Sequence, residues 1–364
     1  MSYLTTYKNV YNIHDILILI CFVNLFFVNY IKIKISFIFT FIFIFIWMCL
    51  NYFFTDLYIF KVEGFSFYYR YLVLLVLLPA ILLEYFKSCH IRNIYLYIYF
   101  ISNILLCLWS IFYFFRFIFN FDFGVSRPSY PLSNDYNVSD AHLLGSHLTF
   151  FFISYIVYLR KYFSHGFIRT ALVISIALSA IIFTGSRSPF IFLILFVFIS
   201  FFYSLSLKKF YYFVIFSFFI LFFVFSRQSF GLRSFKFNID ESVLSRFDKQ
   251  ATAFLNDSNY FLFGSSPFAN SMYWFDGIIG LLYSHGGLLF LLFFFTLSSY
   301  LLLKFKSYFP LFILFFIFVF FQLVTEFVFV LRGTILPFSF IFYLYCFHYN
   351  SNSLFYLKYS NRRI

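Results

Sequence analysis

The segment 184–189, with the sequence TGSRSP, combines the residue types of an anion-binding turn. Pro189 suits the first position of a helix, and Ser188 suits the N-cap before it. Backbone N–H groups and the positive end of the helix dipole would then lie beside the Arg187 guanidinium, which is a favourable place for a phosphate. The alternative is a capped hairpin whose arginine side chain only extends to the phosphates of a lipid surface.

A carboxylate able to act as a general base is found further along the chain. Asp276 directly precedes the helix-like stretch Gly277–Tyr283. A carboxylate can take a proton from a hydroxyl that lies within about 3 Å, and an aspartate at this position can equally serve as a helix N-cap. Glu326 is a second acid, which can act as a base or form an ion pair with Arg332.

These residues lie in a chain whose composition excludes a soluble enzyme, a disordered chain and a disulfide scaffold. Of 364 residues, 63% are hydrophobic, 70 are Phe and only 11% are charged, and the mean hydropathy is +0.91. A soluble domain is about 45–50% apolar and about 25% charged. The five cysteines lie in or beside apolar segments without the spacing of metal ligands, so we expect neither disulfides nor bound zinc.

Long apolar segments predict an all-α, polytopic integral membrane protein with about 11 transmembrane helices. Each segment is apolar on all sides and close to the roughly 17–25 residues that a bilayer core requires. The predicted spans are Asp15–Ile31, Ile35–Phe54, Tyr71–Phe86, Ile94–Phe115, His142–Leu159, Thr170–Gly185, Pro189–Leu207, Phe210–Ser226, Gly286–Leu303, Tyr308–Thr325 and Gly333–His348.

Basic residues mark one side of the predicted membrane. They cluster in every second connection and in the C-terminal tail, and the positive-inside rule places these segments in the cytoplasm. That side carries 14 basic residues and one acidic residue, Glu84, while the other side carries 12 of each. The formal charge of +13 is therefore explained by topology and predicts no nucleic-acid partner.

This topology places the N-terminus outside and the C-terminus inside, and residues 1–364 form a single transmembrane domain. A cytoplasmic N-terminus is the alternative, because the first span is short and flanked by few charges. No small-residue cleavage site follows that span, so no cleaved signal peptide is expected. Two long connections face outward, a smaller periplasmic loop at 116–141 and a larger one at 227–275. Long ordered loops usually carry function, so we expect the site on the outer face.

Arginine is enriched on the outer side, where its planar guanidinium can bind phosphate through two hydrogen bonds without losing its charge. This enrichment suggests an anionic, lipid-borne ligand such as a pyrophosphate, although some of these arginines can instead pair with the outer acids. The outer arginines are Arg70, Arg116, Arg127, Arg187, Arg227, Arg233, Arg246 and Arg332.

The order of these motifs resembles the O-antigen polymerase and O-antigen ligase superfamily. The TGSRSP turn is similar to that family's Ser-Arg turn between two spans. After the larger outer loop, Trp274–Leu282 (WFDGIIGLL) and His285–Leu289 (HGGLL) look like its Asp/His-Asn-x-x-Leu and Gly-Leu-Leu pattern. Phe263-Gly264 resembles the preceding Phe-Gly.

Two fainter similarities extend the resemblance over roughly residues 127–303. Ser245-Arg246 resembles an upstream Gly-Arg, and Asp140–Gly145 (DAHLLG) resembles an Asn-x-Leu-Gly. The chain departs from the pattern at Gly277, where the family usually has Asn, and after Gly287, where a second Gly is missing. Asp276 stands where ligases tend to have His, which favours the polymerase.

The resemblance implies a metal-independent glycosyltransferase of the bacterial inner membrane with its active site facing the periplasm. Its partners would be an undecaprenyl-pyrophosphate-linked oligosaccharide donor, a lipid-linked acceptor and membrane lipids, and a chain-length regulator protein is a further partner that such an enzyme can have. No cofactor or metal is expected. Cations must stabilise the leaving pyrophosphate. The expected catalytic residue is Asp276, and the expected substrate-binding residues are Arg187, Arg246, Arg233, Arg332 and Arg127.

Two other functions stay open at this point. The same fold could be the O-antigen ligase, which attaches the glycan to lipid A-core. A flippase for the same lipid-linked sugar is the alternative from another class. Transporters commonly place charges and broken helices at mid-membrane, whereas the polar groups here gather at the outer ends of the spans, which favours chemistry at the surface.

Overall fold

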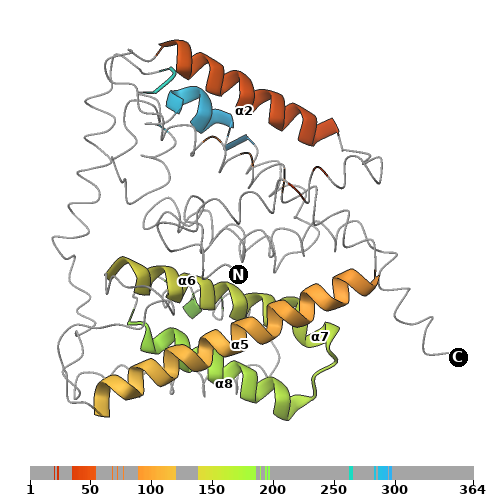
Figure 1. Ribbon diagram of the computed structural model, residues 1–364, viewed down its shortest axis with the longest axis vertical. Helices are drawn as coiled ribbons and strands as arrows, with labels where there is room; N and C mark the ends of the chain where they lie inside the picture. The colour runs from red at the N-terminus through yellow and green to blue at the C-terminus, as the bar shows by residue number, and fades with distance from the viewer. Residues whose placement is uncertain are drawn as a thin grey trace, which may run out of the picture.

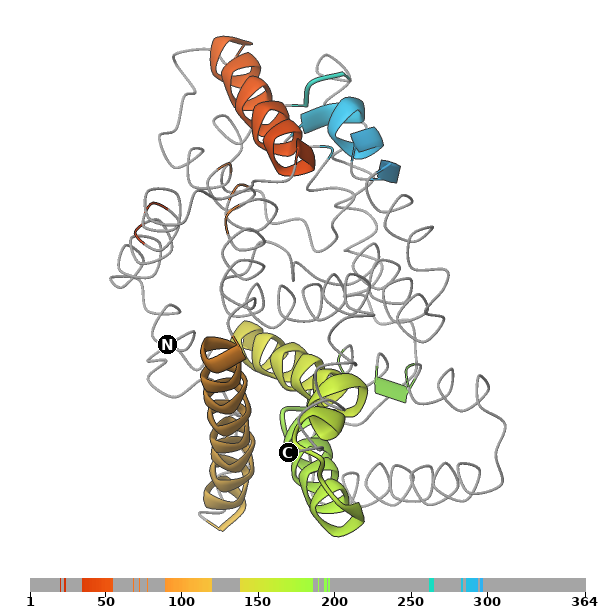
Figure 2. The ribbon, with the colours of Figure 1, turned by 90° about the vertical axis from the view of Figure 1, so that its right-hand side faces the viewer.

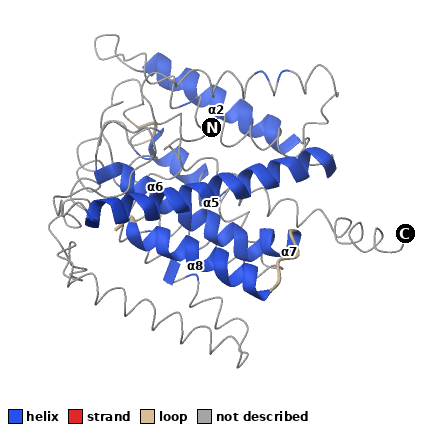
Figure 3. Cartoon of the chain, turned by 60° about the horizontal axis from the view of Figure 1, so that its bottom comes forward, coloured by secondary structure: helices blue, strands red, loops and turns tan. Residues whose placement is uncertain are grey.

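The structure is a computed structural model in which the described residues are 35–54, 89–119, 138–185 and 286–293, with short pieces at 20, 23, 68, 72, 77, 189, 193–194, 196, 262–264, 283 and 295–296. Every regular element among these residues is helical, and none is a strand (Figure 3). The expected all-α class is therefore confirmed for the described part of the chain.

Two long helices coincide with predicted spans. Helix α2 (Ile35–Phe54) has the predicted bounds, and α5 (Cys89–Phe119) contains the predicted span Ile94–Phe115. Within α5, the segment Asn93–Phe115 has 23 residues and is the one described helix long and apolar enough to cross a membrane. The remaining ends of α5 continue past charged residues because backbone hydrogen bonding does not depend on an apolar side chain.

Helix α6 (Val138–Ser154) is the most enclosed of the described helices. It continues through a π-helical turn, η4 (Tyr155–Leu159), into the short α7 (Arg160–Tyr162). Every residue from 144 to 155 is buried. Residues 116–119 and 138–141, which the sequence places in the smaller outer loop, belong to helices here.

Helix α8 (Phe167–Phe183) packs against α5 through small side chains (Figures 1 and 2). The Ser110 hydroxyl of α5 donates a hydrogen bond of 3.1 Å to the Ala180 carbonyl of α8. At one end of this contact the rings of Phe114 and Phe183 stack with centroids 4.1 Å apart. Small residues allow two helix backbones to approach closely. We call this contact the α5–α8 seam, and Ser110 and Ala180 are its buried small residues.

Helix α2 lies beside the helical residues 286–293 in both Figure 1 and Figure 2. Aromatic rings join the two segments. Phe43 and Phe293 stack with ring centroids 4.0 Å apart, and Trp47 meets Phe290 at 5.7 Å. These contacts connect the N-terminal part of the chain to the segment that follows the larger predicted outer loop.

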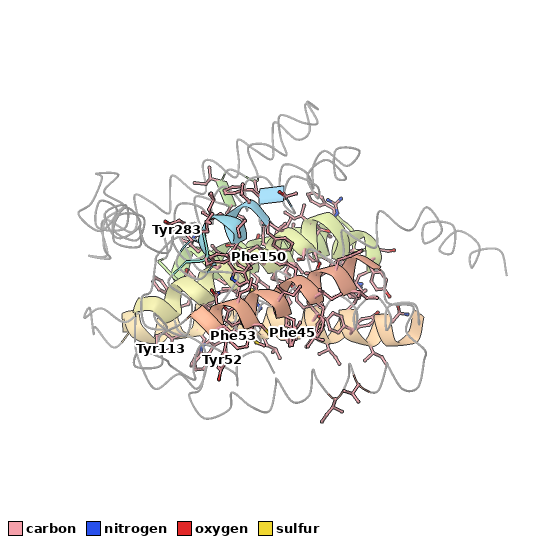
Figure 4. The ribbon with its side chains drawn as sticks, turned by 90° about the horizontal axis from the view of Figure 1, so that it is seen from above. Phe45, Tyr52, Phe53, Tyr113, Phe150 and Tyr283 are labelled. Atoms are coloured by element: carbon pink, nitrogen blue, oxygen red, sulfur yellow. The ribbon has the colours of Figure 1, made fainter. Side chains whose placement is uncertain are left out.

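The exposed faces of α2 and α5 are made of large apolar side chains. Phe53 on α2 is 79% exposed, and Phe112 on α5 is 60% exposed. Phe45, Tyr52 and Phe53 are labelled along α2 in Figure 4. The buried faces carry apolar side chains such as Leu96 and Leu106 together with the polar Asn51 and Asn103. Exposed apolar faces of this kind are not what water favours.

Candidate functional site

The end of α8 forms the first half of the predicted anion-binding turn. Thr184 is completely buried, and its hydroxyl donates a hydrogen bond of 2.7 Å to the Ile181 carbonyl. Gly185 has a φ of +67°, and its N–H donates to the Ile182 carbonyl at 3.0 Å. A left-handed residue directly after a helix is a common C-terminal cap and favours glycine. Gly185 therefore caps the C-terminal end of α8.

The far side of the turn is also held in place. Pro189 is helical and buried, as expected for the first position of the next helix. Its carbonyl lies 3.5 Å from the Thr149 hydroxyl of α6, which donates a shorter bond of 2.9 Å to Gly145. The described residues on either side of Arg187 therefore lie at the end of α8 and beside α6.

A second contact joins two pieces of the predicted motif region, Leu262–Gly264 and Gly286–Leu289. The Leu289 N–H donates to the Leu262 carbonyl at 3.4 Å. A Cβ added to Gly264 would lie 2.6 Å from the Gly287 nitrogen, and one added to Gly287 would lie 2.5 Å from the Gly264 nitrogen. Both glycines have positive φ, +74° and +62°. We call this contact the glycine clasp.

Helix α2 packs directly against the glycine clasp. Trp47 is 4% exposed and lies against Phe263 and Phe290, with ring centroids 6.0 and 5.7 Å away. Its indole nitrogen is 2.9 Å from where a Cβ on Gly286 would stand. The clasp is thus packed against aromatic rings, and the missing side chain of Gly286 leaves room for Trp47.

Helix α6 carries a buried histidine that the sequence alone does not single out. His147 is 2% exposed and lies between buried Ser146 and Thr149. A polar side chain buried in this way is costly unless it is hydrogen-bonded. The signal that could have found it is the polar run 145–149 (GSHLT) inside an otherwise apolar segment.

A further polar pair joins η4 to the turn between α7 and α8. The Tyr155 hydroxyl and the His165 Nδ1 share a hydrogen bond of 2.9 Å, and the rings of Phe100 and Phe163 pack against the imidazole. Partial burial lowers the pKa of His165 below its ordinary value of 6.5, and the positive charge of Arg169 lowers it further. His165 is therefore expected to be neutral near pH 7.

The residues predicted to bind or transform a substrate all lie outside the described residues, namely Asp276, Arg187, Arg246, Arg233, Arg332 and Arg127. Their closest described neighbours in sequence are Gly185 and Pro189, on either side of Arg187, and Tyr283, which follows Asp276. Within the described residues, no group of three or more His, Cys, Asp or Glu side chains is placed to hold a metal ion.

Comparison with known protein families, curated proteins and solved structures gives no significant match to this chain. Function is therefore inferred from the residues themselves and from the contact between Leu262–Gly264 and Gly286–Leu289.

Proposed function

We propose that the chain is a polytopic protein of the bacterial inner membrane, with the arginine-rich connections facing the periplasm. The apolar exposed faces of α2 and α5, with exposed Phe53 and Phe112, support this proposal because lipid is the solvent that such faces match. Buried Asn51 supports it too, since polar side chains in membrane helices face their protein neighbours. Its side chain donates a hydrogen bond to the Tyr68 hydroxyl.

Within that membrane, we propose that the chain is an O-antigen polymerase. It would transfer an undecaprenyl-pyrophosphate-linked glycan onto a lipid-linked repeat unit at the periplasmic face. The observation that carries this proposal is the glycine clasp. Phe263-Gly264 and Gly286–Leu289 are 22 or more residues apart, and each resembles a piece of the polymerase motif pattern. Their contact supports reading the two pieces as one unit.

The proposed reaction is a displacement at the sugar carbon that bears the pyrophosphate. The acceptor hydroxyl forms the new C–O bond, its proton passes to the Asp276 carboxylate, and the bond to the undecaprenyl pyrophosphate breaks. The leaving group keeps the electron pair, so cations must face it. The proposed positive charge comes from guanidinium groups, so the reaction needs no metal ion. These groups belong to Arg187, Arg127, Arg233, Arg246 and Arg332.

Deletion of the gene, followed by gel analysis of the lipopolysaccharide, tests this function. Loss of a polymerase leaves core capped by one repeat unit, whereas loss of a ligase leaves bare core. A deletion strain with bare core would replace the polymerase assignment by the ligase. Restoration of the full ladder by both Arg187→Ala and Asp276→Asn would leave the function in place and overturn the site assignment.

A further inference from the structure

We propose that the turn between α7 and α8 binds an anionic phospholipid of the cytoplasmic leaflet. The lipid phosphate would lie on the guanidinium groups of Arg160 and Arg169, and its acyl chains would lie along the exposed apolar face of α8. Such binding requires the membrane placement proposed above, but it does not depend on the polymerase reaction. Two of the basic residues that orient the chain would then also hold a ligand.

The turn between α7 and α8 is held by hydrogen bonds on both sides (Figure 1). The His165 N–H donates to the Arg160 carbonyl at 3.1 Å, and the Thr170 hydroxyl donates to the His165 carbonyl at 3.4 Å. The imidazole is fixed in turn by its 2.9 Å hydrogen bond with the Tyr155 hydroxyl. Arg160 and Arg169 therefore flank one ordered turn.

The positive charges of the two arginines act on the same place. Both side chains are exposed. The charge of Arg169 acts on His165, and the charge of Arg160 acts on Tyr155, the hydrogen-bond partner of His165. Arg169 also lies in the first turn of α8, where the helix dipole disfavours a cation. An anion bound at this turn would offset both charges.

The sequence around these arginines contains no acidic residue. Residues 141–239 include neither Asp nor Glu. Among the described residues the one acid is Asp140, which precedes Arg160 by 20 residues of helix, or about 30 Å along the axis. On the predicted cytoplasmic side, Glu84 alone is acidic. The counter-charge is therefore expected from outside the chain, and anionic headgroups of the cytoplasmic leaflet are an abundant source of it.

The apolar surface beside the arginines favours a lipid over a free phosphate. Ile168 and Leu172 lie one turn apart on α8 and are 79% and 56% exposed. A free phosphate would leave this surface uncovered, whereas the acyl chains of a phospholipid would lie against it. Arginine suits the other end of such a ligand, because its guanidinium can bind a phosphate through two hydrogen bonds.

Native mass spectrometry of the full-length protein in detergent micelles tests this site. The probes are phosphatidylglycerol, which is anionic, and phosphatidylcholine with the same acyl chains, which is neutral overall. We expect the wild-type protein to bind phosphatidylglycerol more tightly. A basic residue near an anionic lipid surface contributes about fivefold in affinity, so Arg160→Gln with Arg169→Gln should weaken the binding of phosphatidylglycerol about 25-fold.

Two controls separate this site from a general effect of charge. Lys208→Gln with Lys209→Gln removes two charges from another predicted cytoplasmic connection, and we expect it to weaken binding less than the arginine variant does. Glu84→Gln should leave binding unchanged, because the arginines are not expected to pair with that carboxylate. Glycerol phosphate, which carries the charge without the acyl chains, should not displace the lipid at equal concentration.

The opposite results overturn the proposal. They are equal binding of the two lipids, equal losses in the arginine and lysine variants, or displacement by glycerol phosphate, which would identify a free-phosphate site. Tighter binding in Glu84→Gln would show that this carboxylate neutralises the turn instead. Recovery of the protein from cells in the aqueous fraction would overturn the membrane placement itself. None of these measurements uses glycan transfer, so the proposed polymerase function stands or fails separately.

Discussion

Replacing Ala180 by leucine should destabilise the protein by opening the α5–α8 seam. Ala180 is completely buried, and its carbonyl accepts the 3.1 Å hydrogen bond from Ser110. Three additional carbons in a closely packed site cost about 1–3 kcal/mol, and an interhelical hydrogen bond in a membrane protein contributes about 0.6 kcal/mol. We therefore expect Ala180→Leu to lower the free energy of unfolding by about 2–3 kcal/mol.

The assay is an SDS titration of protein in mixed micelles, followed by tryptophan fluorescence. Ala171→Leu is the matched control, because Ala171 lies on the exposed face of the same helix. An exposed substitution of this kind changes stability by no more than about 0.5 kcal/mol. If both variants lose the same free energy of unfolding, or if Ala180→Leu loses none, small residues do not determine how closely α5 and α8 pack.

Three further predictions concern the turns at the two ends of α8. Ser164 is exposed in the turn that the charge pattern places in the cytoplasm, so Ser164→Cys should react with an impermeant maleimide in inverted vesicles and not in spheroplasts; the opposite labelling would reverse the topology. Because the pKa of His165 lies below 6.5 in the folded protein, the unfolded chain binds the proton first, and stability should fall as pH drops through 6.5. His165→Gln should remove that dependence in unfolding titrations at pH 7.5 and about pH 5.5. If the free energy of unfolding falls equally between these pH values in the variant and the wild type, His165 is not the group responsible. Gly185→Ala, at a φ of +67°, should cost about 1–2 kcal/mol, whereas Gly166→Ala, at a φ of −66° and with nothing within 4 Å of the added Cβ, should cost less; equal thermal stability of the two variants would contradict the left-handed cap.

The four longest described helices agree with predicted spans because a long apolar run has few alternatives to a helix. The bounds of α2 were predicted correctly, whereas α5 and α6 extend beyond the apolar runs. The π-helical turn η4 was not predicted, since it depends on how Tyr155 packs against Phe100 and His165. Local pattern carries no information about such a contact.

Part of the candidate site could likewise be predicted from the sequence, and part of it required the structure. The turn at Thr184–Gly185 and a helical Pro189 follow from local residue preferences, and the sequence predicts both, whereas the left-handed cap at Gly185 was not predicted. The glycine clasp joins segments more than 20 residues apart, so it required the structure, as did the support from Trp47 on α2. The roles of Asp276 and the outer arginines stay predictions.

The most direct test of the central claim is glycan lengthening by the purified protein in lipid vesicles. The substrate is an undecaprenyl-pyrophosphate-linked repeat unit, and the products are separated by size. We predict a ladder of longer lipid-linked chains without added metal ion, and the loss of that ladder in Asp276→Asn. A protein that moves the lipid across the vesicle membrane and never lengthens the glycan would contradict it.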